Sequence, residues 1–186
     1  MSRSRFMLQG RQDRLLDELI EELQIFPAVF EDRANNIFQK LLGQPHGRNI
    51  LRLEEVARFL EKLKLKPIIL REQPNKGRTI IEKFVDYSDV SFAVVLLTAD
   101  DRGGTFDAPF DEQQPRGRQN VILELGFFLG SLGRARVCAL YEDGVEIPSG
   151  YEGVAFVSLD NGGAWRMSLA REIKEAGLPV DMNDAI

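Results

Sequence analysis

The sequence is poor in the residues that most often cross-link a small protein or bind a metal ion in it. Its 186 residues include one cysteine and one histidine. An internal disulfide needs two cysteines, and a structural zinc site usually needs four Cys or His ligands, so neither is available here. A domain of this length buries roughly 70% of the surface that its unfolded chain exposes, which is enough for a core without such links.

Long apolar runs and an excess of basic residues are also absent. The longest apolar stretches, 92–97 and 121–132, are shorter than the ~20 residues that cross a bilayer, and the first residues lack the apolar region of a secretory signal. Lys and Arg number 24 against 29 Asp and Glu, a formal net charge of −5. This balance lacks the dense basic footprint of a nucleic-acid-binding surface. We therefore expect a soluble cytoplasmic protein with no membrane partner and no direct nucleic-acid partner.

From about residue 50, short apolar runs alternate with segments of helical periodicity. The apolar runs occupy residues 67–70, 92–97, 137–141 and 154–157. Helices are predicted at about 51–63, 80–87, 118–132 and 165–176. Thr79 and Glu82 have the spacing of a capping box, which marks the start of the second of these helices. The alternation predicts an α/β fold, in which helices flank a parallel sheet through right-handed crossovers.

The first 45 residues have a different pattern. A stripe of apolar residues at helical spacing, with acids opposite, comprises Leu15, Leu16, Leu19, Ile20 and Leu23. A second short helix is predicted over 33–42. We expect a helical N-terminal extension at 1–45, serving as a docking or dimerising pair, followed by a nucleotide-binding domain at 46–186.

A polar segment at 100–115 follows the carboxyl end of the apolar run 92–97. Its 16 residues show no periodicity, and structureless loops of that length are usually functional or disordered. Ligands of open α/β sheets bind at the carboxyl ends of the strands, near the point where the strand order reverses. The segment is therefore a candidate active-site lid.

Glu124 is the one ionisable residue between Arg118 and Arg134. At ~100° per residue it lies at the border of the apolar face of the predicted helix 118–132. A carboxylate at such a border loses hydration and is expected to be paired or functional. The alternative is an exposed glutamate on an ordinary amphipathic helix.

Arg116 and Arg118 precede the same helix. Cations at a helix N-terminus oppose the macrodipole, so helix stability gives no reason for them there. With the free backbone N–H groups of the first turn they would form a site for a phosphate or pyrophosphate. The alternative is that both are solvated loop charges.

An ordered series of motifs resembles the bacterial TIR-like family, which includes the TIR effectors of the CBASS and Pycsar anti-phage systems. The resemblance covers about residues 46–180 and includes Asn120-Val-Ile-Leu-Glu-Leu-Gly126. The matching segments are 56–63, 67–70, 72–74, 77–84, 87–90, 93–98, 118–126, 133–134, 137–140 and 145–149.

The resemblance implies a flavodoxin-like TIR fold and NAD glycohydrolase activity, which splits the bond between nicotinamide and ribose. The catalytic glutamate of the family carries over to Glu124. Nicotinamide leaves as a neutral molecule, so one carboxylate suffices without a general acid, a metal or a further cofactor. NAD or NADP is then the substrate. The segment Glu72–Arg78 takes the place of the BB loop, which borders the nucleotide and mediates self-association.

We expect further substrate-binding residues around this site. The motif His46-Gly-Arg-Asn49 matches the start of the family's domain, and the other candidates follow the strand at 92–97 or precede the helix at 118–132. The set comprises His46, Gly47, Arg78, Thr98, Asp100, Arg116, Arg118 and Asn120.

One departure from the family concerns its first strand. Residues 40–45 should form this strand, but they include Gly43 and Pro45, and proline cannot donate to a central ladder. The first strand is therefore doubtful. This leaves a catalytically silent nucleotide-binding or assembly module as an alternative. A more distant alternative, which shares the fold class and the glutamate chemistry, is a nucleoside deoxyribosyltransferase-like enzyme.

Overall fold

The computed structural model describes residues 36–40, 47–72, 77 and 79–186. Their order along the chain is β1 (Asn36–Lys40), α2 (Gly47–Lys62), β2 (Lys66–Ile69), η1 (Leu70–Glu72), α3 (Ile80–Asp86), β3 (Phe92–Leu97), β4 (Asp101–Gly103), β5 (Gln114–Arg116), α4 (Gln119–Leu132), η2 (Arg134–Arg136), β6 (Val137–Tyr141), β7 (Ala155–Ser158), α5 (Ala164–Glu175) and η3 (Met182–Ala185).

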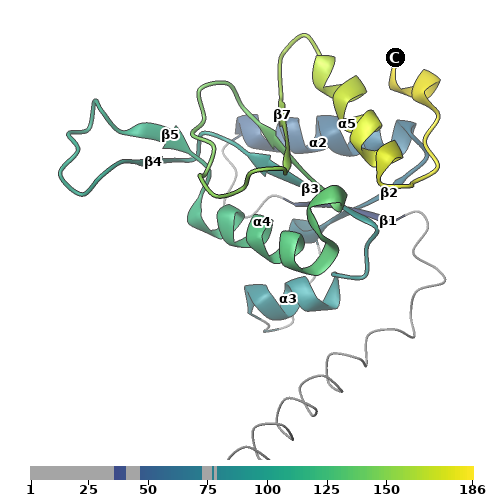
Figure 1. Ribbon diagram of the computed structural model, residues 1–186, viewed down its shortest axis with the longest axis horizontal. Helices are drawn as coiled ribbons and strands as arrows, with labels where there is room; N and C mark the ends of the chain where they lie inside the picture. The colour runs from purple at the N-terminus through teal and green to yellow at the C-terminus, as the bar shows by residue number, and fades with distance from the viewer. Residues whose placement is uncertain (1–35, 41–46, 73–76, 78) are drawn as a thin grey trace, which may run out of the picture. The chain divides into compact units, whose positions relative to one another are not determined.

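A five-stranded parallel sheet in the order β2-β1-β3-β6-β7 organises the domain. The chain runs from β1 outward to β2, then returns across β1 to β3 and continues to β7. Helices α2 and α5 cover one face of the sheet, while α3 and α4 cover the other (Figure 1). This is the flavodoxin-like order, and its switch point lies between β1 and β3.

Strand β3 lies at the centre of the sheet, and all six of its residues are buried. Phe92, Val94 and Leu96 pack in the cluster under α2 and α5. The alternate residues, including Val95 and Leu97, pack in the cluster under α3 and α4. The continuous apolar run of the sequence is thus explained by helices on both faces, and each such side chain contributes roughly 1.5–3 kcal/mol by burial.

The first strand is where the sequence prediction was wrong. Asn36–Lys40 is a central strand, in which Ile37 is paired with Pro67 of β2 and with Phe92 of β3. The predicted helix over 33–42 is incorrect, and so is the doubt about the first strand. The predicted domain boundary lies at residue 45, whereas the compact unit that holds the sheet spans Arg33–Ile186.

A short apolar run fits helix and strand equally well, which explains this error. The neighbouring strands determine which structure forms. Between β2 and β3, two rows of backbone N–H and C=O groups need partners, and only a strand can pair with both rows. The predicted amphipathic helix over 15–23 and the segment 41–45 lie outside the described residues.

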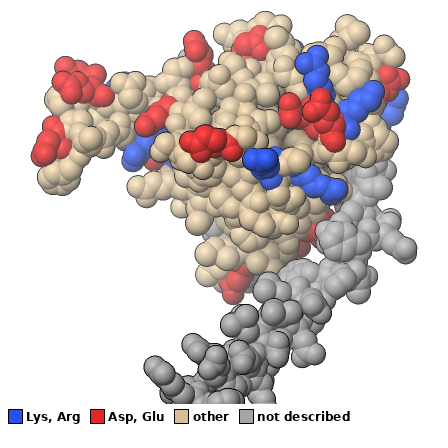
Figure 2. Space-filling model, viewed as in Figure 1, with Lys and Arg blue, Asp and Glu red and all other residues tan. Residues whose placement is uncertain are grey.

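The predicted structureless loop at 100–115 contains a two-stranded antiparallel ribbon. Strands β4 and β5 pair Arg102 with Pro115, and the ribbon extends away from the sheet (Figure 1). Acidic side chains gather on it (Figure 2). The exposed ones are Asp101, Asp107, Asp111 and Glu112.

The capping box at the start of α3 is confirmed. The backbone N–H of Thr79 donates to Glu82 Oε2 at 2.7 Å, and the backbone N–H of Glu82 donates to Thr79 Oγ1 at 3.3 Å. Two N–H groups of the first turn are thereby satisfied. Within the described ranges, the helices are too short or too polar to cross a membrane.

Candidate active site

Glu124 is completely buried in α4, with 0% of its surface exposed. The neighbouring residues Val121, Leu125 and Phe128 press the same helix onto the sheet. The sequence predicted that Glu124 lies at the border of this apolar face. In the structure this border position is also buried. The alternative of an exposed glutamate is therefore wrong. Holding a carboxylate out of water costs free energy that packing of α4 does not require, which makes Glu124 a candidate functional group.

Aromatic rings line the flank of α4 on which Glu124 lies. Phe127 and Phe128 follow Glu124 by three and four residues, so they share its side of the helix. Their ring centroids are 5.3 Å apart, and Phe84 of α3 lies 5.3 Å from Phe127 and 6.2 Å from Phe128. Phe127 thus serves in packing between α3 and α4. The low polarity of this wall strengthens electrostatic interactions made by the carboxylate.

Thr98 and Asp100 are brought together at the carboxyl end of β3. The buried Thr98 donates from Oγ1 to Asp100 Oδ2 at 2.7 Å, and the backbone N–H of Asp100 donates to the Thr98 carbonyl at 2.7 Å. The carboxylate of Asp100 is therefore held in one orientation, beside the switch point of the sheet.

Arg116 lies at the base of the ribbon, where Gly103 leaves room for its guanidinium group. Its Nε is buried and has no hydrogen-bond acceptor among the described residues. Arg116 lines a cavity of about 340 Å³ together with Gly117, Ile122, Glu146, Pro148, Ser149 and Tyr151.

This cavity opens on a different flank of α4 from Glu124. Ile122 lines the cavity and precedes Glu124 by two residues, which at ~100° per residue places them about 200° apart around the helix. Arg116 and Glu124 were predicted to act in one site. The cavity that Arg116 lines includes Ile122 and not Glu124, and a shared site stays a prediction.

Arg118 and Asn120 lie at the start of α4. Arg118 is the half-buried N-cap residue, with no capping bond from its side chain, while its carbonyl accepts from Val121 N–H at 2.9 Å. Asn120 is exposed. Both lie at this helix end, where backbone N–H groups favour an anion.

Three further candidates were predicted, Gly47, His46 and Arg78. Gly47 is the first residue of α2, whereas His46 and Arg78 lie outside the described residues. Of the predicted self-association segment 72–78, the structure describes Glu72 and Gly77. Gly77 is exposed and has φ 72°, a left-handed conformation that favours glycine.

Sequence reasoning missed the other residues that line the cavity with Arg116. Glu146 N–H donates to the Pro115 carbonyl at 2.8 Å, which ties the segment after β6 to the ribbon. Ser149 and Tyr151 follow in the same segment. Only the turn residues Pro148 and Gly150 signal a loop here, and they do not indicate what it faces.

Comparisons with known proteins agree with the fold. Protein YuaY of Escherichia coli (strain K12) is 43% identical over 161 residues, covering 86% of this chain and 52% of YuaY. Protein tirC of Dictyostelium discoideum is 37% identical over 98 residues, or 51% of this chain and 49% of tirC. The Pycsar effector protein BcPycTIR of Burkholderia cepacia is 37% identical over 83 residues, or 41% and 24%.

The chain thus spans about half the length of the first two relatives and about a quarter of the third. The family model described as "CAP12/Pycsar effector protein, TIR domain" matches residues 45–161. This match includes β2, β3, β6 and all of α4 with Glu124. The chain belongs to the TIR-domain family of CAP12/Pycsar effector proteins.

Proposed function

We propose that this chain is a TIR-type NAD(P)⁺ glycohydrolase that uses Glu124 as its catalytic carboxylate and depletes NAD in anti-phage defence. The observation that carries the proposal is the complete burial of Glu124 in α4, within the segment that matches the family. The activity would take place in the cytoplasm, where its dinucleotide substrate is found.

The chemistry needs one carboxylate. The bond between the pyridinium nitrogen of nicotinamide and the anomeric carbon of ribose breaks, and its electron pair stays with the nitrogen. Positive charge develops on the ribose, where an adjacent carboxylate stabilises it or traps it covalently. Water then adds to the anomeric carbon and releases one proton. The products are nicotinamide and ADP-ribose, or its phosphorylated form from NADP.

The other groups of the site would bind rather than react. Asp100, oriented by Thr98, would accept hydrogen bonds from hydroxyl groups of the substrate. Arg118 and the N-terminus of α4 would favour its pyrophosphate. Roles for His46, Gly47, Arg78, Arg116 and Asn120 remain part of the proposal, as does self-association through Glu72–Arg78.

The first strand bears on the alternative of a silent module. A silent module was considered because the sequence predicted a nucleotide site that lacks its first strand. Asn36–Lys40 fills this position next to β3, so the structural reason for an inactive domain is removed.

The experiment follows nicotinamide release from NAD over a series of protein concentrations, because self-association is part of the proposal. Glu124→Gln keeps the shape of the side chain and should lower the rate on the order of 100-fold or more. Glu152→Gln alters an exposed carboxylate and should leave the rate unchanged. Thermal melting of both variants establishes that each is folded. Equal rates for folded Glu124→Gln and the wild type would overturn the assignment.

A further inference from the structure

A large polar cleft lies at the carboxyl ends of β3, β6 and β7, next to the start of α2. Its volume is about 980 Å³, within the range of small-molecule sites. It lies on the α2 and α5 side of the sheet, whereas Glu124 lies under α4 on the other side. The lining residues are Leu51, Arg52, Glu55, Ala99, Glu142, Asp143, Ser158, Leu159, Asp160 and Asn161.

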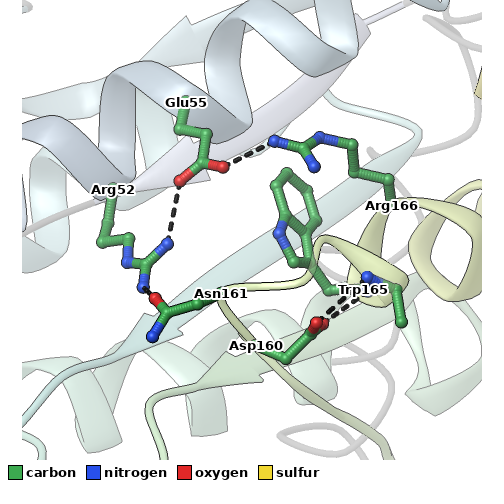
Figure 3. A network of polar contacts seen from close by, with 7 residues as sticks. Arg52, Glu55, Asp160, Asn161, Trp165 and Arg166 are labelled. Atoms are coloured by element: carbon green, nitrogen blue, oxygen red, sulfur yellow. Dashed lines mark hydrogen bonds and ion pairs between the residues drawn. The ribbon is translucent and has the colours of Figure 1, made fainter.

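An ion pair joins α2 and α5 beside this cleft (Figure 3). Glu55 of α2 accepts from Arg52 Nη1 at 3.0 Å and from Arg166 Nη2 of α5 at 2.6 Å. Arg52 also donates to the side chain of Asn161. The carboxylate of Glu55 is thus neutralised by two arginines, and the wall of the cleft is a defined network.

Trp165 lies beneath this network and is 1% exposed. Phe59 meets its ring edge-on at 5.2 Å, and the Arg166 guanidinium lies 4.8 Å from the ring centroid. These contacts hold the indole in one orientation. Its Nε1–H is buried and has no acceptor within the part of the chain that the structure describes. Figure 3 shows this nitrogen on the side of the ring that faces Arg52 and Asn161.

A buried indole N–H normally has a hydrogen-bond partner. On the side of the ring that carries this nitrogen lie Arg52 and the exposed Asn161, which both line the cleft (Figure 3). A ligand that displaced the Asn161 side chain would therefore reach a donor whose direction is already set. The ligand atom at this position must be an acceptor, which excludes a simple ammonium ion.

The charges of the cleft exclude a second class of ligand. Among the described residues, four carboxylates line it, and Arg52 is the one lining cation. Asp160 accepts from the backbone N–H groups of Trp165 and Ala164 at 2.9 and 3.2 Å, and these bonds lower its pKa. An ionised carboxylate therefore already occupies the N-terminus of α5. A phosphate would meet repulsion here rather than an anion site.

A hydroxyl group satisfies both requirements, because it accepts from an N–H and donates to a carboxylate. Asp143 is exposed on the wall and accepts no hydrogen bond from the described residues. Ser158 adds a hydroxyl nearby, and Leu51, 67% exposed, adds an apolar surface on which a ring can pack.

We propose that this cleft binds a neutral, hydroxyl-bearing ligand of the nucleoside class. A ligand oxygen accepts from Trp165 Nε1–H, Asp143 accepts from its hydroxyls, and Leu51 contacts its base. The proposal does not depend on NAD cleavage at Glu124.

The protein contains one tryptophan, so its tryptophan fluorescence reports on the surroundings of Trp165. Adenosine should change the emission of Trp165 saturably when excitation is restricted to the red edge of the tryptophan band. Adenosine monophosphate should bind at least about tenfold more weakly, because its phosphate enters a field of carboxylates. No saturable change with adenosine, or equal affinity for both compounds, would overturn the proposal.

Two variants separate this cleft from the Glu124 site. Asp143→Asn should weaken adenosine binding about tenfold or more through loss of a charge-assisted bond, with NAD cleavage unchanged. Asp107→Asn removes a comparable exposed charge on the ribbon and should bind adenosine like the wild type. Glu124→Gln should also retain the fluorescence response. If Glu124→Gln loses it, or if Asp143→Asn keeps full affinity, adenosine binds elsewhere and the assignment fails.

Discussion

Gly103 and Arg116 meet across the base of the β4–β5 ribbon, and the guanidinium group occupies the space that a side chain on Gly103 would take. The position of Arg116 therefore depends on the absence of a Cβ at residue 103. The glycine makes possible a buried Nε in a ribbon most of whose residues are exposed.

Gly103→Ala should expel the guanidinium while leaving the fold intact, because the atoms that must move are the far end of a flexible side chain. If Arg116 binds the dinucleotide, Gly103→Ala and Arg116→Ala should both raise KM for NAD several-fold with kcat nearly unchanged. Steady-state kinetics of nicotinamide release measure this. Unchanged KM in both variants would remove Arg116 from the substrate-binding set.

Gln39→Pro tests the first strand. Proline at this position removes a backbone N–H from a strand paired on both sides and leaves a carbonyl without its donor, so stability should fall by about 1–3 kcal/mol or more. Gln39→Thr, a good strand former, should be nearly neutral. Urea unfolding of both variants provides the measurement. Equal midpoints would mean that residue 39 is not in a central strand.

Acid should weaken the contact that Asp160 makes at the start of α5. The backbone N–H of Trp165, and then that of Ala164, lower the pKa of Asp160. A carboxyl whose folded pKa lies below its unfolded pKa stabilises the protein above the unfolded pKa, and the benefit disappears as the pH falls through the folded value.

Asp160→Asn should accordingly be less stable than the wild type at neutral pH, and the gap in melting temperature should narrow below about pH 4. Melting curves for both proteins across the acid range test this. A gap that stays constant with pH would show that the charge of Asp160 contributes nothing.

Cys138 should resist thiol reagents in the folded protein. It is completely buried in β6, and this burial raises the pKa of its thiol, so both access and thiolate formation are suppressed. Labelling should begin only on unfolding. Cys138→Ser combined with Ser149→Cys moves the thiol to an exposed position and should react at once. Prompt labelling of the native wild type would contradict the packing of β6.

Elements with a strong local pattern were predicted correctly. The apolar run at 92–97 became β3, and the capping box at Thr79 and Glu82 begins α3. Both signals are local: a strand buried on two faces needs apolar residues throughout, and a capping box is complete within four residues. The order of motifs also indicated the TIR family, which the match over 45–161 confirms.

Elements that depend on a distant partner were not predictable in this way. The local pattern of β1 is compatible with a short helix. Its pairing with β2 and β3 in the folded domain makes it a strand. Strands β4 and β5 are three residues each, and only their pairing distinguishes them from a loop. The cleft above Trp165 combines residues as far apart as Arg52 and Asn161, a proximity that no local pattern encodes.

The sequence by itself determined the α/β class, the helix that carries Glu124 and the family of the chain, because these follow from periodicity and from motifs within short segments. Only the tertiary structure decided that Asn36–Lys40 completes the sheet, that Glu124 is fully buried and that Arg116 lines a cavity with Ile122 of α4. The physical reason is that backbone pairing, burial and the field around a charge are set by residues far away in the chain.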